Sequence, residues 1–98
     1  MPFMIETFDK ANHYDLRLAL RDEHLVYLDE HMHLLIACGA KLNDAGDHAS
    51  GGVYLVALEE REAAREFIEN DPFYKGELFE RVEIVRWRQA YLDGKNTL

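Results

Sequence analysis

Several residue types that would place this chain in a specialised class of protein are scarce in it. Among its 98 residues there are one cysteine, two prolines and six glycines. A single cysteine, Cys38, cannot form an internal disulfide or a thiolate metal site, and it favours a reducing, cytoplasmic compartment. The low glycine and proline content excludes collagen and low-complexity disorder. The composition therefore predicts an ordinary globular domain.

Long apolar runs and basic residues are also lacking. No apolar run approaches the roughly 18 residues that a membrane-spanning helix requires, and the start of the chain, MPFMIETFDK, lacks the basic region of a signal peptide. Eleven Lys and Arg against 19 Asp and Glu give a formal net charge of −8. A surface of that sign repels phosphate backbones and anionic lipids. We therefore expect no nucleic-acid partner and no membrane partner.

What the chain does contain is an alternation of strand and helix patterns. Four strands are expected at residues 3–8, 34–40, 53–58 and 79–88, and two helices at residues 22–33 and 60–69. Residues 11–21 are ambiguous between irregular chain and a short helix. The order predicts an α+β fold of the ferredoxin-like βαββαβ type, a four-stranded antiparallel sheet with both helices on one face. We expect a single domain over residues 1–98, with a core over about 3–88 and a polar tail over 89–98.

Particular apolar residues are expected in the interior. Leu25, Leu28 and Met32 recur at helical spacing, which predicts a stripe facing the core. The continuous apolar run at 34–40 predicts a buried strand, and Cys38 within it is most simply a small buried hydrophobe.

The strand over residues 53–58 bears on the oligomeric state. Its two faces are both apolar, with Val53 and Leu55 on one side and Tyr54 and Val56 on the other. A sheet with one face in water should alternate apolar and polar residues. Because two helices cover only one side, we expect a second copy of the chain to cover the other, as a homodimer. The alternative is a monomer with an exposed apolar face.

Chain direction in this topology brings His24 and Asp71 to the same end of the domain. His24 is expected in the first turn of its helix, and Asp71 follows the second helix, held extended by Pro72. Asp71 would accept a hydrogen bond from one ring nitrogen, leaving the other to exchange a proton with a small-molecule ligand. The helix N-terminus favours the neutral ring and the carboxylate favours the charged one. A structural hydrogen bond or a helix cap is the simpler alternative.

Further ligand-binding groups are expected at that end of the domain. Ser50, Gly51 and Gly52 begin a strand there, and the glycines would allow a ligand to approach closely. Arg17 and Arg21 lie near the same entry and are candidates to hold a carboxylate or enolate oxygen, although pairing with surface acids is the simpler explanation. No metal site is expected, because the histidines and carboxylates are not clustered at ligand spacing.

Several segments together resemble the YCII-related (YciI-like) domain family. The run RLALRDEHLVYL at residues 17–28 resembles its RLxxRpxHLxyL segment. Further positions along the chain also match the family pattern: Gly39, Gly51-Gly52, Ala63-Ala64, Asp71-Pro72-Phe73, Gly76, Val82, Ile84 and Trp87-Arg88. The resemblance spans about residues 3–88. It implies a dimeric α+β barrel with a His/Asp-centred active site, carried onto His24 and Asp71. One protein resembling this family is a dehydrochlorinase that acts on a chlorinated aromatic.

The chain departs from the family pattern at positions that could contact a ligand. Gly52 stands where the family has serine, and Phe73 stands where it has tyrosine. Two hydroxyl groups are therefore absent, and Ser50 and Tyr74 are the candidates to replace them.

Three functional hypotheses follow. The first is a cofactor-independent enzyme that uses His24 as general acid and base for elimination, isomerisation or hydrolysis of a small metabolite. The second is a non-catalytic dimeric module that binds a small ligand or a partner protein. The third, drawn from dimeric ferredoxin-like barrels that oxidise aromatics or degrade haem, predicts a coloured protein.

Overall fold

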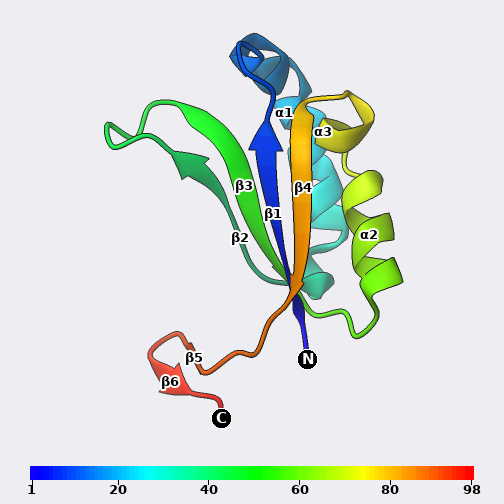
Figure 1. Cartoon of the computed structure of the whole chain (residues 1–98), viewed down its shortest axis with the longest axis vertical. Coiled ribbons are helices and arrows are strands. Elements are labelled where there is room, and N and C mark those ends of the chain that lie inside the picture. Colours follow the sequence, from blue (N-terminus) through cyan, green and yellow to red (C-terminus); the bar gives the residue numbers. More distant parts are fainter.

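A four-stranded antiparallel sheet, ordered β2-β3-β1-β4, forms one layer of the protein (Figure 1). The computed structural model describes all 98 residues. The strands are β1 (Phe3–Asp9), β2 (Leu35–Leu42), β3 (Ala49–Val56) and β4 (Phe79–Arg86). The helices are α1 (Tyr14–Glu30), α2 (Arg61–Glu69) and α3 (Pro72–Lys75), with a 3-10 turn at Met32–Leu34. This arrangement confirms the predicted ferredoxin-like α+β fold.

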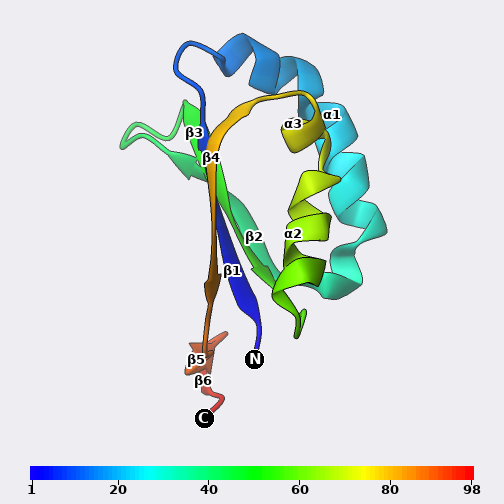
Figure 2. The same ribbon diagram turned by 45° about the vertical axis from the view of Figure 1, so that its right-hand side comes forward.

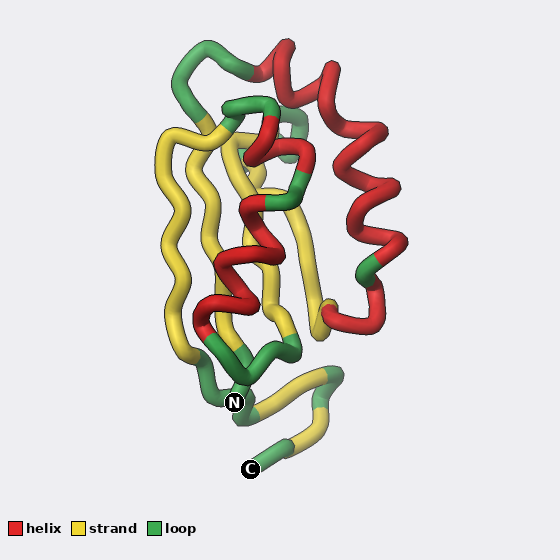
Figure 3. Tube along the Cα trace, turned by 90° about the vertical axis from the view of Figure 1, so that its right-hand side faces the viewer, coloured by secondary structure: helices red, strands yellow, loops and turns green.

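All the helices lie on one face of the sheet, and the core fills the space between the two layers (Figures 2 and 3). Alternate residues of β1 are buried, as expected for a strand with one covered face. The buried core consists of Phe3, Ile5, Tyr54, Val56, Ala64, Phe67 and Ile68. Each large apolar side chain buried there contributes roughly 1.5–3 kcal/mol. The Tyr27 hydroxyl also donates to the Phe67 carbonyl at 2.7 Å, which joins α1 to α2.

The first helix differs from the prediction at both ends. It begins at Tyr14 and ends at Glu30, so the ambiguous residues 11–21 are largely helical and His24 lies in mid-helix rather than in the first turn. The start of the helix was missed because its two buried residues, Arg17 and His24, are polar. Because polar residues occupy core-facing positions, the apolar periodicity that reveals a helix is broken. The predicted influence of the helix N-terminus on His24 is therefore wrong.

The expected core stripe on this helix is also wrong for two of its three residues. Leu25 and Met32 are 39% and 64% exposed, and Leu28 packs against the core. The apolar run at residues 34–40 is not a buried strand either, because β2 lies at the edge of the sheet and is mostly exposed. Cys38 is accordingly exposed rather than buried.

The chain after α2 and after β4 also departs from the prediction. The chain between α2 and β4 contains the short helix α3, which was not predicted, and β4 ends at Arg86 rather than at residue 88. Residues 89–98 include two short paired strands, β5 (Tyr91–Leu92) and β6 (Lys95–Asn96). This hairpin projects away from the main sheet, next to the chain's C-terminus (Figure 1).

The second face of the main sheet is uncovered in the single chain (Figure 2). Met4 and Leu55 are opposite each other in register on β1 and β3, and their exposure is intermediate. Val85 on β4 is 46% exposed. The face is therefore partly apolar and lies open.

No helix of the structure is both long and apolar enough to span a bilayer.

Candidate active site

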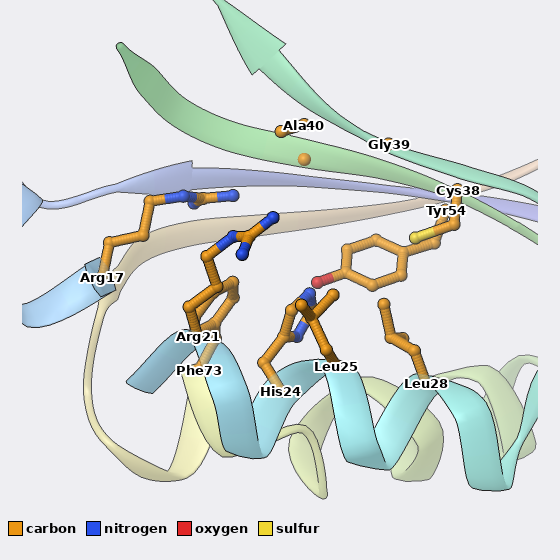
Figure 4. A pocket seen from close by; sticks show the side chains of 11 residues that line it. Arg17, Arg21, His24, Leu25, Leu28, Cys38, Gly39, Ala40, Tyr54 and Phe73 are labelled. Carbon is orange, nitrogen blue, oxygen red and sulfur yellow. The ribbon is translucent and has the colours of Figure 1, made fainter. Parts of the chain in front are cut away.

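One side of α1 supplies three polar side chains to a pocket between this helix and the sheet. Arg17, Arg21 and His24 are spaced four and three residues apart, which places them on the same helix face. The pocket has a volume of about 220 Å³. Its walls are formed by Arg17, Arg21, His24, Leu25, Leu28, Cys38, Gly39, Ala40, Gly52, Tyr54 and Phe73. Figure 4 shows the α1 side chains reaching toward the sheet and Tyr54 projecting from β3 toward the His24 ring.

The structure places His24 and Asp71 in direct contact. The Nδ1 atom of His24 lies 2.8 Å from Oδ1 and 2.9 Å from Oδ2 of Asp71. Asp71 is completely buried, and His24 is 8% exposed, on the wall of the pocket. No group of the protein bonds to the Nε2 atom of His24. Because a carboxylate only accepts hydrogen bonds, Nδ1 carries a proton and, in the neutral ring, Nε2 is the free base.

Asp71 is held in place by its position between two helices. It is extended, with φ −65° and ψ 132°, as expected for the residue before a proline, and its side chain caps α3 by accepting from the Phe73 backbone N–H at 2.8 Å. The hydroxyl of Tyr54 donates to its Oδ2 atom at 3.1 Å. The carboxylate thus has a backbone donor, an imidazole donor and a phenol donor, which together compensate for its burial.

Tyr54 contacts the His24–Asp71 pair, and the sequence analysis did not identify it as a candidate site residue. It pairs in register with Ile5 on β1 and Cys38 on β2, and its side chain faces the helices. Burial, together with the charge of Asp71, raises the pKa of the Tyr54 phenol well above its ordinary value. The hydroxyl therefore remains a donor throughout the physiological pH range. The alternation of side chains along β3 could have indicated this position, because Tyr54 lies on the same face of the strand as the apolar residue Val56.

The two arginines have different environments. Arg17 is buried, and its guanidinium donates to Oδ2 of Asp9 at 2.7 Å and to the Gly51 carbonyl at 3.4 Å. It also lies over the Phe73 ring, 4.8 Å from the ring centre. Arg21 is exposed and makes no hydrogen bond or ion pair within the chain, although it lines the same pocket. Only one of the two predicted anion-binding residues therefore has a free guanidinium.

Phe73 forms an aromatic support for the imidazole. Its ring stacks on that of His24, with ring centres 3.8 Å apart and an angle of 11° between the planes. Arg17 and His24 both contact this ring from α1. The phenyl group thus limits rotation of the imidazole and presents an apolar wall to the pocket.

Of Gly51 and Gly52, the glycines expected to admit a ligand, only Gly52 lines the pocket, while Gly51 contributes its carbonyl oxygen to Arg17. A side chain at Gly51 would overlap the Thr7 carbonyl, so this position needs glycine because two strands approach closely.

Ser50 and Tyr74 do not reach the pocket and do not replace the missing hydroxyl groups. Ser50 lines a separate hollow beside His13 and His48. Tyr74 is 40% exposed and lies near Phe79 on another surface. Ser50 is adjacent in sequence to Gly51, and Tyr74 is adjacent to Phe73. Adjacent residues point to opposite faces of a strand, or about 100° apart on a helix, so these two side chains face away from the pocket.

Cys38 lines the pocket but has the environment of an unreactive thiol. Although the residue as a whole is exposed, neighbouring atoms partly desolvate the thiol, and this desolvation, together with the nearby Asp71 carboxylate, raises its pKa to about 11. A thiol of that pKa remains protonated near neutral pH and is a poor nucleophile. No group of three or more His, Cys, Asp or Glu side chains lies together as a metal site.

The fold and the pocket define a small α+β protein with an imidazole–carboxylate pair at the wall of a cavity of about 220 Å³. The chain belongs to the family of the YCII-related domain, whose model matches residues 1–88. No protein with a curated description matches it.

A solved structure with extensive similarity is that of 5-chloro-2-hydroxyhydroquinone dehydrochlorinase from Burkholderia phenoliruptrix, in complex with 2,5-dihydroxybenzoquinone. The TM-score is 0.84 and the sequence identity 26%, over 90% of this chain and 94% of that chain. An Arabidopsis thaliana protein matches with a TM-score of 0.48 and 12% identity, over 95% and 99% of the two chains. A NIPSNAP domain protein from Burkholderia xenovorans matches with a TM-score of 0.49 and 20% identity, over 94% and 98%.

Proposed function

We propose that this protein is a cofactor-independent enzyme of the lyase type, in which His24 exchanges a proton with a small ring compound. The observation that carries the proposal is the contact of 2.8 Å between Nδ1 of His24 and Asp71 at the wall of the pocket. An imidazole held in one tautomer by a carboxylate is a suitable general base and acid near neutral pH. The structural similarity to a dehydrochlorinase supports elimination as the reaction class.

The chemistry requires only the side chains of the pocket. The reacting form is the keto tautomer of the ring, in which the carbon that bears the leaving group is tetrahedral. Nε2 of His24 removes a proton from a hydroxyl group conjugated to that carbon, or from the carbon next to it, and the electron pair of the broken bond forms a C=O or C=C double bond. The conjugated electron pairs shift so that the leaving group, a halide in the simplest case, departs with the electron pair of its own bond, and the imidazolium later loses the proton to water. Asp71 stabilises the imidazolium, and the Phe73 ring limits its rotation.

The dimensions of the pocket agree with a ligand of one aromatic ring. A cavity of about 150 Å³ is sufficient for benzene, and this pocket has about 220 Å³. Six of its eleven lining residues are hydrophobic, among them Leu28 and Phe73. The dehydrochlorinase was solved with a ligand of one ring, 2,5-dihydroxybenzoquinone. We propose a hydroxylated or enolisable ring as the substrate class.

The test is turnover by the purified protein. We expect chloride release from 5-chloro-2-hydroxyhydroquinone, or exchange of solvent deuterium into related hydroxylated rings, measured by ion chromatography and by NMR. Binding of these compounds without chloride release or exchange would instead support the non-catalytic ligand-binding module. Neither binding nor turnover with any member of the series would contradict both functions.

We also propose that a second copy of the chain covers the open face of the sheet, as the apolar residues Met4, Leu55 and Val85 favour. A two-fold axis would place the same apolar residues of both copies against each other. A dimer of this kind would leave the pocket accessible, because α1 and the pocket lie on the opposite face.

The dimer predicts a molecular mass of twice the 11.4 kDa of the chain in light scattering at micromolar concentration. Leu55→Glu places a charge at the centre of the open face, so we expect this variant to be monomeric. The matched control is Val26→Glu on α1, which is 59% exposed and should leave the dimer intact. A monomeric wild-type protein, or equal effects of both substitutions, would contradict the proposed interface.

A further inference from the structure

We infer that Gly52 determines the size of the ring that the pocket accepts, because the side chain missing at this position leaves a notch that receives one apolar substituent of the ligand. The notch is the space beside Gly52 that Thr7, Ala40 and Tyr54 border. This inference rests on the proposed function, because it concerns the same pocket. It goes further in assigning the substrate class, a ring with a substituent of the size of a methyl group or a chlorine atom, and the residue that selects it.

A side chain at Gly52 would point into the pocket. Gly52 lies two residues before Tyr54 on β3, so the two positions share a face of the sheet. The Tyr54 side chain projects from that face toward the His24 ring (Figure 4). A Cβ atom at Gly52 would lie 3.5 Å from the Tyr54 ring and 3.5 Å from the Thr7 hydroxyl oxygen. Because Gly52 also lines the pocket, such a side chain would occupy space that is now open to a ligand.

The fold requires glycine at position 51 but not at position 52. A Cβ atom at Gly51 would overlap the Thr7 carbonyl oxygen, whereas the nearest atom to a Cβ at Gly52 would be the Gly39 carbonyl oxygen at 3.2 Å. A small shift of β2, which is an edge strand, relieves that contact. Gly52 also lacks the positive φ that favours glycine. Since glycine weakens the interior of a strand, we attribute its presence here to the space that it leaves in the pocket.

Gly52 offers the ligand space rather than a hydrogen bond. Its backbone N–H donates to the hydroxyl oxygen of Thr7 at 2.9 Å, and Thr7 is completely buried. Ala40 pairs in register with Gly52, lines the same pocket and contributes only a methyl group. Paired residues of antiparallel strands lie on the same face. The methyl group of Ala40 and the ring of Tyr54 make the notch mainly apolar, so it suits an apolar substituent.

A substituent in the notch would also orient the ring. The pocket of about 220 Å³ is larger than the roughly 150 Å³ that is sufficient for benzene, so an unsubstituted ring can rotate in its plane. A substituent held beside Gly52 prevents this rotation and keeps one edge of the ring toward Nε2 of His24. Fixing the reacting atoms near each other is a major source of catalysis.

The test compares two ligands of equal charge by isothermal titration calorimetry, 2,5-dihydroxybenzoquinone and its 3-methyl derivative. We expect the wild-type protein to bind the methyl derivative roughly fourfold more tightly, the value of burying one such group. Gly52→Ala fills the notch, so it should bind the methyl derivative roughly tenfold more weakly than the wild type does. Its affinity for the unsubstituted ring should change by no more than roughly fourfold, because that ring does not enter the notch.

A matched control and a second variant complete the experiment. Ser50→Thr adds a methyl group at an exposed position of the same strand, outside the pocket, and should leave both affinities unchanged. Ala40→Val narrows the notch from the edge strand, where a β-branched residue is well tolerated. It should weaken binding of the methyl derivative more than that of the unsubstituted ring, and it provides the test if circular dichroism shows that Gly52→Ala is unfolded.

The inference and the proposed function fail in different ways. Tighter wild-type binding of the unsubstituted ring, or a preference for the methyl derivative that neither Gly52→Ala nor Ala40→Val alters, overturns the assignment of Gly52 and leaves the role of His24 intact. An equal loss of affinity for both rings in Gly52→Ala also overturns it. Binding of neither ring by the wild-type protein contradicts the proposed substrate class and the inference together. A methyl preference that depends on Gly52 in a protein without turnover supports the notch and removes the enzyme.

Discussion

Replacement of His24 by asparagine is expected to lower kcat/KM about 10²–10⁴-fold, the usual contribution of a general acid–base group. The asparagine amide takes the place of Nδ1 and can still donate to Asp71, so the buried carboxylate remains paired and the fold is retained. What is lost is the Nε2 atom, which has no partner in the protein and is the proposed base. The measurement is steady-state turnover on the substrate found in the screen, together with circular dichroism to show that the variant is folded.

The matched control for this prediction is His33→Asn. His33 is an exposed histidine that does not line the pocket. Its replacement should leave kcat/KM within about twofold of the wild-type value, since exposed substitutions rarely alter the structure. Turnover by His24→Asn at the wild-type rate would show that the imidazole has only a structural role, as a partner of Asp71.

Asp71→Ala is expected to lower the free energy of unfolding by about 3–5 kcal/mol, because it removes one member of a buried and hydrogen-bonded set. Asp71 is 0% exposed and accepts from His24, Tyr54 and the Phe73 backbone. Alanine leaves these donors without an acceptor, removes the cap of α3 and opens a cavity. Such a loss is a large part of the 5–15 kcal/mol by which domains are typically stable.

Urea denaturation followed by circular dichroism measures this effect. Asp22→Ala, at an exposed position in the middle of α1, provides the matched loss of a carboxylate and should change the free energy of unfolding by less than about 0.5 kcal/mol. Asp71→Asn should fall between the two, because the amide oxygen still accepts hydrogen bonds while the negative charge is lost. Equal stabilities of Asp71→Ala and Asp22→Ala would contradict the structural role of the buried carboxylate.

The strands were predictable as short apolar runs, although the runs at residues 34–40 and 53–58 do not alternate in polarity. In the structure β1 alternates buried and partly exposed residues, and the turn-forming residues 43–47 lie between β2 and β3. The start of α1 was not predictable from periodicity, since Arg17 and His24 occupy its buried face. The polar residues of the proposed site thus interrupt the apolar pattern of the helix that carries them.

The neighbourhood of His24 and Asp71 was predictable from topology, although the reason given for the position of His24 was incorrect. The two residues meet because α1 passes the point where α2 ends and α3 begins, not because His24 starts a helix. The replacement hydroxyls were misplaced because each is adjacent in sequence to a site residue, and adjacency puts Ser50 and Tyr74 on other surfaces.

By itself the sequence determined the order of elements, the ferredoxin-like topology and the pair of residues at its centre. These follow from local periodicity, from turn residues and from the few ways in which a βαββαβ chain can close. Only the tertiary structure decided which of the charged side chains at the pocket have a partner within the protein and which have none. The pairing of Arg17 with Asp9, the donation of Tyr54 to Asp71 and the lack of any partner for Arg21 depend on contacts between distant segments. Such contacts are set by packing in three dimensions and leave no periodic signal in the chain.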